Sequence, residues 1–165
     1  ALLRALKNFS FTSGIKIKWP NDILFKGKKL AGILVEISAE PHASTKIIIG
    51  IGINVNMLLA QKEINRAWTS LALIKGENIN RNEVIKVLIK ELSQALNTFK
   101  REGLPAFINE YQSNSYLNGT DITLTAGKFI YKGNAKGINQ EGHLKIELED
   151  GSTKYFSSGE VTVTY

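Results

Sequence analysis

Three short stretches in the first third of the chain hold the residues whose types and spacing could carry chemistry. They are the runs 18–22 (Lys-Trp-Pro-Asn-Asp), 29–33 (Lys-Leu-Ala-Gly-Ile) and 50–54 (Gly-Ile-Gly-Ile-Asn). These runs bring the cation of Lys29, the carboxylate of Asp22 and two asparagine amides next to strands that contain glycine. Charged and polar groups at the border of an apolar slot suit a ligand with a flat apolar body and an anionic end.

The third stretch predicts a strand with one apolar face and one bare face. Side chains of a strand alternate between faces, so the odd-numbered residues of 47–55, all Ile or Val, share one face and Gly50 and Gly52 share the other. Long β-branched runs indicate that the apolar face is buried. Glycine weakens a strand, so two on one face indicate that something other than a neighbouring side chain lies against the backbone. Gly32 sits in the same way within 30–37. The alternative is that these glycines mark bulges or a close contact between sheet and helix.

The surrounding sequence predicts the elements that position these residues. Pro20 restricts the backbone of Trp19 and predicts an extended turn that carries Asn21 and Asp22. Lys29 begins the strand that carries Gly32, and Gly27 supplies the unusual backbone angle of the preceding hairpin turn. The expected strands of this region are 15–18, 23–25, 30–37 and 47–55.

The rest of the chain predicts helices and then a small all-β unit. Apolar residues at helical spacing predict a helix in 1–9, and Asn80 caps a long helix that ends at Gly103 and carries a wide apolar stripe. We expect that helix to be a core helix. Pro105 opens a shorter one. From residue 118 the period changes to two, and the expected strands are 121–126, 129–138, 143–149, 153–156 and 161–164.

Composition excludes several classes of site. The 165 residues include 43% apolar and 22% charged side chains, as in a globular protein with a proper core. With no cysteine and two histidines, the chain has no disulfide, no cysteine nucleophile and almost no material for a histidine metal site. No signal peptide or long apolar run is visible, so we expect a cytoplasmic protein without a membrane partner.

The net charge of +6 is unevenly distributed. Residues 1–117 hold sixteen Lys and Arg against nine Asp and Glu, whereas residues 118–165 hold five against six. Lys16, Lys26 and Lys28 are best explained as a solvated face of edge strands. The alternative is that this basic region attracts nucleotide phosphates, an acidic partner or nucleic acid.

In order and spacing, the three stretches closely resemble the catalytic core of the biotin protein ligases, and the resemblance continues to the C-terminus. It implies an α+β fold in which residues 1–117 form a mixed central sheet packed against helices, an incomplete biotin/lipoate ligase-like domain. Residues 118–165 would form a small SH3-like β-barrel, with Gly159 and Glu160 near the active-site side of the central domain. Where some members have an arginine close to the end, this chain has Thr164.

The resemblance also implies an activity. ATP would activate biotin to biotinyl-5′-AMP, and the biotinyl group would pass to a lysine of a biotin carboxyl carrier protein. Lys29 would stabilise the negative charge on oxygen, and Asp22 would hold Mg²⁺ or orient the attacking amine, unless it only caps the turn after Pro20. The residues expected to bind substrate are Asn21, Gly32, Ile33, Gly50, Gly52, Asn54 and Trp68, the last with core packing as its alternative. We expect no metal site built from protein side chains alone.

Members of the family carry an Arg/Gly-rich lid loop, and some carry a DNA-binding helix-turn-helix, ahead of the region that this chain resembles. We find neither in the sequence, so we expect the chain to be a fragment that is inactive alone. DNA would be a partner only if a helix-turn-helix precedes Ala1 in the parent protein. Homodimerisation by pairing of sheet edges stays open.

Two other functions stay open at this point. Lipoate or octanoyl ligases and transferases share the broader fold, although the run 18–22 and the C-terminal strands favour biotin. A non-catalytic regulatory module that binds nucleic acid or a protein is the other alternative. The sequence shows no aromatic and basic stacking pattern that would favour it.

Overall fold

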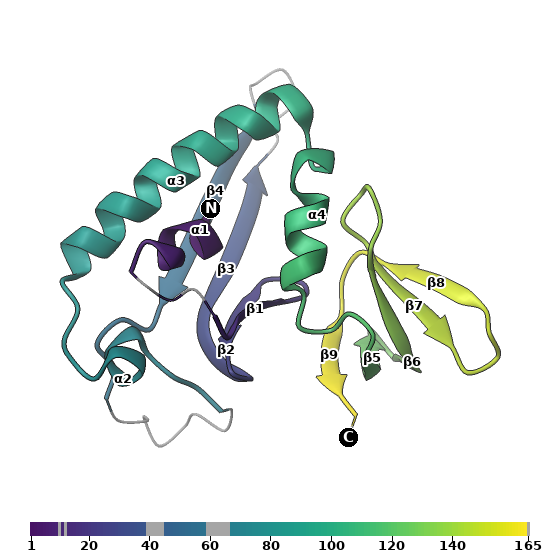
Figure 1. The fold of residues 1–165 in the computed structure, drawn as a ribbon. Helices are drawn as coiled ribbons and strands as arrows, with labels where there is room; N and C mark the ends of the chain where they lie inside the picture. Colours follow the sequence, from purple (N-terminus) through teal and green to yellow (C-terminus); the bar gives the residue numbers. More distant parts are fainter. Residues whose placement is uncertain (10, 12, 39–44, 59–66, 165) are drawn as a thin grey trace.

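A computed structural model describes residues 1–164 except 10, 12, 39–44 and 59–66. The chain forms a four-stranded sheet flanked by helices, followed by a five-stranded sheet that lies beside it, with α4 between the two (Figure 1). In chain order the elements are α1 (Leu2–Lys7), β1 (Ile15–Lys18), β2 (Asp22–Phe25), β3 (Lys28–Ser38), β4 (Lys46–Ile53), α2 (Leu71–Lys75), α3 (Arg81–Glu102), α4 (Pro105–Asn114), β5 (Asp121–Ala126), β6 (Phe129–Ile138), β7 (Leu144–Leu148), β8 (Thr153–Phe156) and β9 (Glu160–Val163). None of the described helices has a stretch long and apolar enough to cross a membrane.

The first sheet has the strand order β1-β2-β3-β4, and each of these neighbours is antiparallel. Lys26 and Gly27 both have positive φ, 47° and 77°, which is the backbone of a tight hairpin turn between β2 and β3. A mixed sheet was expected. Among the described residues, parallel pairing is confined to two isolated bridges, Ile17 with Ser115 and Lys29 with Trp68.

One face of this sheet packs on a core formed with α1, α2 and the start of α3. Leu6, Leu30 and Leu71 are almost completely buried there, and Ile51 and Ile53 of β4 lie against them. The buried members of this cluster are Leu2, Leu3, Leu6, Phe11, Ile15, Ile23, Leu30, Ala31, Leu71, Ile79 and Val84. The predicted apolar face of β4 is therefore confirmed for the half of the strand nearest the core.

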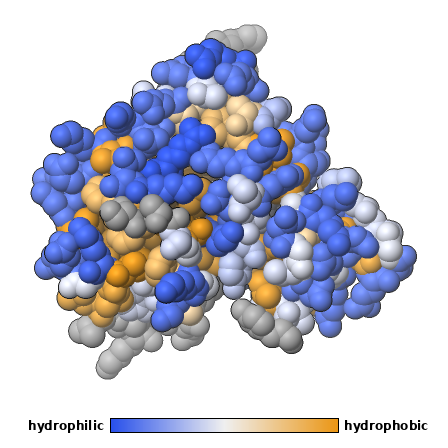
Figure 2. Space-filling view, in the orientation of Figure 1, coloured by the Kyte–Doolittle hydropathy of each residue, from blue (hydrophilic) through white to orange (hydrophobic). Residues whose placement is uncertain are grey.

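The outer half of that face is not buried, which corrects the expectation for the whole run. Ile37 is 67% exposed and Ile47, its partner in the β3–β4 register, is 60% exposed. Figure 2 shows apolar surface over the central part of the molecule, whereas the part formed by the C-terminal sheet is mostly hydrophilic on this face.

The prediction that α3 is a core helix is wrong for most of its length. The helix begins at its Asn80 cap, whose side chain accepts from the Asn82 amide, and ends at Gly103, as expected. It fully buries only Val84 and Ala95, however, and a stripe of four other apolar residues is exposed. The reason is geometric, because the six-residue α1 packs on α3 and can cover only a short part of a 22-residue helix. The exposed stripe consists of Ile85, Ile89, Leu96 and Phe99.

The C-terminal sheet is antiparallel and has the order β8-β7-β6-β5-β9. Leu117, Ile122, Leu124 and Ile146 are almost completely buried in its core. The five strands fall where the sequence predicts them. In the part of the chain that the structure describes, no pairing joins β8 to β9, so closure into a barrel is not seen.

An ion pair joins α1 to α4 and gives a testable effect of pH on stability. Arg4 donates from Nε and Nη2 to the Glu110 carboxylate, with the shortest contact at 2.6 Å, and this hydrogen bond holds the pKa of Glu110 below its ordinary value. A depressed carboxyl pKa stabilises the folded state above the ordinary glutamate pKa, and the stabilisation is lost as pH falls through the depressed pKa.

We therefore expect Glu110→Gln to lower the free energy of unfolding at neutral pH by up to about 1 kcal/mol, because the pair is partly exposed. The difference from the original protein should disappear in acid, as urea unfolding at several pH values would measure. Glu102→Gln, which breaks a more exposed pair with Arg101, is the matched control and should change little. A loss that is constant with pH would rule out the ion pair as its cause.

Candidate functional site

The bare face of β3 and β4 forms the floor of an open groove. Gly32 lies directly across from Gly52 in the antiparallel register, and Leu34 lies across from Gly50. The groove has a volume of about 550 Å³, and its lining consists of Asn21, Asp22, Lys29, Gly32, Ile33, Leu34, Gly50, Ile51 and Gly52. Sequence reasoning named seven of these nine residues as functional, and the structure brings them together.

The floor glycines are not explained by backbone strain or by internal packing. None of Gly32, Gly50 and Gly52 has positive φ, and the β3–β4 register runs without a shift from Ala31 to Ser38. A Cβ at Gly50 or Gly52 would meet no atom closer than 3.7 Å. Bulges and close helix contacts are therefore excluded at these two positions, and the bare backbone is available to a ligand.

A β-bulge brings Lys29 onto the groove face. Simple alternation would place Lys29 and Gly32 on opposite faces, because they are three residues apart. The register shifts between Ile23 and Leu24, however, so that Asp22 pairs with Gly32 while Leu24 pairs with Lys29. One extra residue in β3 re-aims the lysine, as bulges near functional sites often do.

The result is an ion pair at the rim of the groove. The Lys29 ammonium lies 2.6 Å from the Asp22 carboxylate, and the two side chains are 39% and 18% exposed. A Cβ at Gly32 would lie 3.4 Å from both partners. The pair therefore stands over the glycine floor and is still reachable from solvent.

Asn21 and Asn54 donate to the protein's own backbone. Asn21 Nδ2 donates to the Ile33 carbonyl at 2.8 Å, and the Ile33 amide donates to the Asn21 carbonyl at 2.9 Å. Asn54 Nδ2 donates to the carbonyls of Thr69 at 3.0 Å and Lys29 at 3.4 Å. Both amides thus fix the strands around the groove. Asn21 also lines the groove, whereas Asn54 is outside its lining.

Trp68 lies beside the lysine strand. Its neighbours Ala67 and Thr69 exchange backbone hydrogen bonds of 2.9 Å with Lys29, which forms the isolated parallel bridge. Trp68 is half-buried and lines neither of the two cavities at the site. The segment 59–66, just before this residue, lies outside the described residues.

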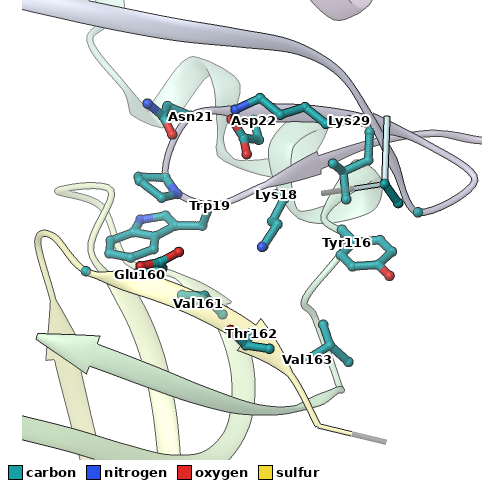
Figure 3. A pocket seen from close by; sticks show the side chains of 15 residues that line it. Lys18, Trp19, Asn21, Asp22, Lys29, Tyr116, Glu160, Val161, Thr162 and Val163 are labelled. Atoms are coloured by element: carbon teal, nitrogen blue, oxygen red, sulfur yellow. Dashed lines mark ion pairs between the residues drawn. The ribbon is translucent and has the colours of Figure 1, made fainter. Parts of the chain in front are cut away.

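A second cavity of about 570 Å³ adjoins the groove and shares Asn21, Asp22 and Lys29 with it. Its opposite wall is β9, with Val161, Thr162 and Val163 facing the β1–β2 turn (Figure 3). Gly159 and Glu160 also line it, in agreement with the expected place of the Gly-Glu pair. The rest of the lining consists of Lys18, Trp19, Pro20, Leu24, Gly27, Ala67 and Tyr116. Lys18 and Tyr116 were not predicted as site residues, and Tyr116 reaches the site because the fold brings the segment after α4 to this turn.

The arrangement suits an anionic ligand that spans both cavities. A flat apolar group can lie on the glycine floor, and the Lys29 ammonium stands where the groove meets the second cavity. Among the described residues, no group of three or more acidic, histidine or cysteine side chains could hold a metal ion. The Lys29 ammonium can polarise and stabilise negative oxygen, with the Asp22 carboxylate adjacent to it.

Comparisons with known proteins agree with this geometry. Residues 2–54 match the model of the "Biotin/lipoate A/B protein ligase family", and residues 119–163 match that of the "Biotin protein ligase C terminal domain". The structure superposes on apo biotin protein ligase from Aquifex aeolicus with a TM-score of 0.85 and 31% identity, covering 99% of this chain and 70% of that one. This chain belongs to the biotin protein ligase family. The Aquifex ligase in complex with biotin and ATP gives a TM-score of 0.84 at 31% identity, over 99% of this chain and 67% of that one.

Other biotin protein ligases are similar in sequence. The bifunctional ligase/repressor BirA of Escherichia coli is 33% identical over 150 residues, which are 90% of this chain and 46% of that protein. The biotin--[acetyl-CoA-carboxylase] ligase of Mycobacterium tuberculosis is 32% identical over 147 residues, 88% of this chain and 52% of the relative. The chain thus spans about half the length of these relatives.

Proposed function

We propose that the protein carrying this chain is an ATP-dependent biotin–[acetyl-CoA-carboxylase] ligase. The single observation that carries the proposal is the glycine-floored groove that ends at the Lys29–Asp22 pair. Relatives described as biotin ligases, and a solved relative in complex with biotin and ATP, support the choice of ligands.

Biotin matches the groove in shape and charge. The planar ureido ring of its fused ring system would lie on Gly32, Gly50 and Gly52, where an added side chain would occupy the ligand's place. Leu34, across from Gly50 on the groove face, would contribute apolar contact, whereas the side chains of Ile33 and Ile51 pack against the core on the other face. The carboxylate at the end of the biotin side chain would then point toward Lys29.

In the first step, a biotin carboxylate oxygen attacks the α-phosphorus of ATP, and the bond to the leaving pyrophosphate breaks. Negative charge increases on oxygens around that phosphorus, and Lys29 would stabilise it. A unit charge about 4 Å away contributes on the order of 4 kcal/mol at an effective dielectric near 20, before desolvation is subtracted. No covalent bond to the protein is needed.

In the second step, the ε-amine of a lysine on a biotin carboxyl carrier protein attacks the acyl carbon of biotinyl-5′-AMP, and AMP leaves. Asp22 lies where both cavities meet and would orient this amine. Mg²⁺ would arrive with ATP and take most of its ligands from phosphates and water, so the Asp22 carboxylate fits as a single protein ligand.

Further parts of the proposal concern the whole protein. We divide the chain into residues 1–117, as part of the catalytic domain, and residues 118–165, as an SH3-like barrel, and we place the protein in the cytoplasm. The C-terminal domain match over residues 119–163 supports that boundary. A dimer formed by sheet edges, and DNA binding by a preceding helix-turn-helix, are included only as options for the parent protein.

The direct test compares the full-length gene product with the 165-residue chain. We expect the full-length protein to release pyrophosphate from ATP only when biotin is present, to form biotinyl-5′-AMP detectable by mass spectrometry, and to label a carrier domain. Lipoate should not replace biotin. We expect little or no labelling by the 165-residue chain, because the resemblance implies that an arginine-rich lid holds the anionic intermediate.

Each comparison in this test has a result that would contradict the proposal. Lipoate-dependent turnover in place of biotin-dependent turnover would assign the site to the other branch of the family. Efficient carrier biotinylation by the 165-residue chain would show that the groove needs no lid. A full-length protein that binds neither biotin nor ATP would end the enzymatic assignment.

A further inference from the structure

Trp19 belongs by sequence to the ligand turn but packs in the C-terminal sheet. It is 5% exposed and is a member of the buried cluster that includes Leu124, Leu144 and Val161. Its indole Nε1 donates to the Gly142 carbonyl, in the turn before β7, at 3.2 Å. Figure 3 shows the indole directed toward β9, away from Asp22 and Lys29.

The residues that follow Trp19 are held from the opposite side. Asn21 and Ile33 exchange two hydrogen bonds of 2.8 and 2.9 Å, and Asp22 pairs with Lys29 at 2.6 Å. One short turn is therefore fixed by the C-terminal core at Trp19 and by the groove at Asn21 and Asp22. A shift of the C-terminal sheet would move the turn, because only Pro20 separates the two attachments.

Other contacts join the same two regions, but they lie farther from the reacting groups. The Tyr116 amide donates to the Ile17 carbonyl at 2.8 Å, and Lys16 Nζ donates to the Ser113 carbonyl at 3.2 Å. These bonds attach β1 to the last turn of α4 and to the segment that follows it. Trp19 reaches from the β1–β2 turn itself into the C-terminal core.

We propose that Trp19 is a positioning residue, through which the C-terminal sheet holds Asn21 and Asp22 at the rim of the groove. This inference rests on the proposed function for its effect on turnover. The glycine floor belongs to β3 and β4, which pair with each other directly, so biotin affinity should change much less than the rate when the anchor is weakened. The rate of adenylate formation should fall, because Asp22 and its lysine partner would be misplaced relative to the phosphate.

The test replaces Trp19 with phenylalanine in the full-length protein. Phenylalanine keeps most of the apolar contact and removes the indole donor, so the fold should survive. We expect kcat for biotin-dependent ATP–pyrophosphate exchange to fall about tenfold, with the Kd of biotin changed less than about twofold. The matched control is Ile146→Val on β7, which removes one methylene from the same core outside the turn, and it should keep kcat.

A second readout does not depend on activity. The Ile33 amide donates to the Asn21 carbonyl, so hydrogen exchange at Ile33 reports on the attachment of the turn. We expect faster exchange there in Trp19→Phe and an unchanged rate in Ile146→Val. The inference would be overturned if hydrogen exchange at Ile33 were as slow in Trp19→Phe as in the original protein. An equal loss of kcat in both variants would also overturn it. A full-length protein without biotin-dependent ATP–pyrophosphate exchange would contradict the proposed function. The hydrogen-exchange rate at Ile33 would still decide the role of Trp19.

Discussion

Replacing Lys29 with methionine in the full-length protein is expected to reduce biotinyl-adenylate formation by about a hundredfold, close to 3 kcal/mol of transition-state stabilisation. Methionine keeps the length and apolar character of the side chain, so the loss reports on the charge. The folded state should change little, because the ion pair with Asp22 is partly exposed and such pairs contribute about 1 kcal/mol or less. Biotin-dependent pyrophosphate release and thermal unfolding would measure the two effects.

Lys28→Met is the matched control for this experiment. Lys28 is the preceding residue of β3, is exposed, and lines neither cavity, so its replacement should leave the rate unchanged. Lys29→Arg keeps the positive charge and should recover part of the activity. Unchanged turnover in Lys29→Met would remove this lysine from the mechanism.

Replacing Gly52 with valine should abolish biotin binding while the fold is kept. A Cβ at Gly52 would meet no atom closer than the Gly32 carbonyl oxygen at 3.9 Å, so the protein itself has room for a side chain. Valine also suits a strand better than glycine, and we expect the free energy of unfolding to stay the same or rise by up to about 1 kcal/mol. The valine methyl groups would occupy the place of the biotin rings, so calorimetry should show at least a hundredfold weaker binding.

A graded series at the same position controls for indirect effects. Gly52→Ala should weaken binding less than Gly52→Val, and both variants should unfold no earlier than the original protein. If Gly52→Val bound biotin normally, the ligand would lie elsewhere. If Gly52→Val had a lower free energy of unfolding than the original protein, the glycine would be required by packing. The main evidence for a ligand groove would then be lost.

Most helices and strands of the fold could be predicted from the sequence, because local residue patterns define where they begin and end. The strands 121–126, 129–138 and 153–156 have the predicted bounds, since alternation and glycine turns define them at both ends. The Asn80 cap and Gly103 likewise define α3. The burial of α3 could not be predicted in this way, because an apolar stripe does not say whether another element lies over it.

Most of the predicted site residues lie at the groove, but the way they meet could not be predicted. Lys29 and Gly32 share a face only because β3 has an extra residue at the bulge, and no residue type in that stretch predicts the bulge. The sequence also gives no sign that Asn54 donates to Thr69 and Lys29, or that Trp19 packs in a sheet formed a hundred residues later. These are tertiary contacts between distant segments, which periodicity cannot reveal.

The most direct test of the groove is a crystal structure of the full-length protein with biotinyl-5′-AMP. We predict that the fused rings lie on the backbone of Gly32, Gly50 and Gly52, and that Lys29 Nζ contacts an oxygen of the acyl phosphate. A groove filled by the protein's own side chains, with Lys29 directed into solvent and the ligand bound elsewhere, would contradict the account.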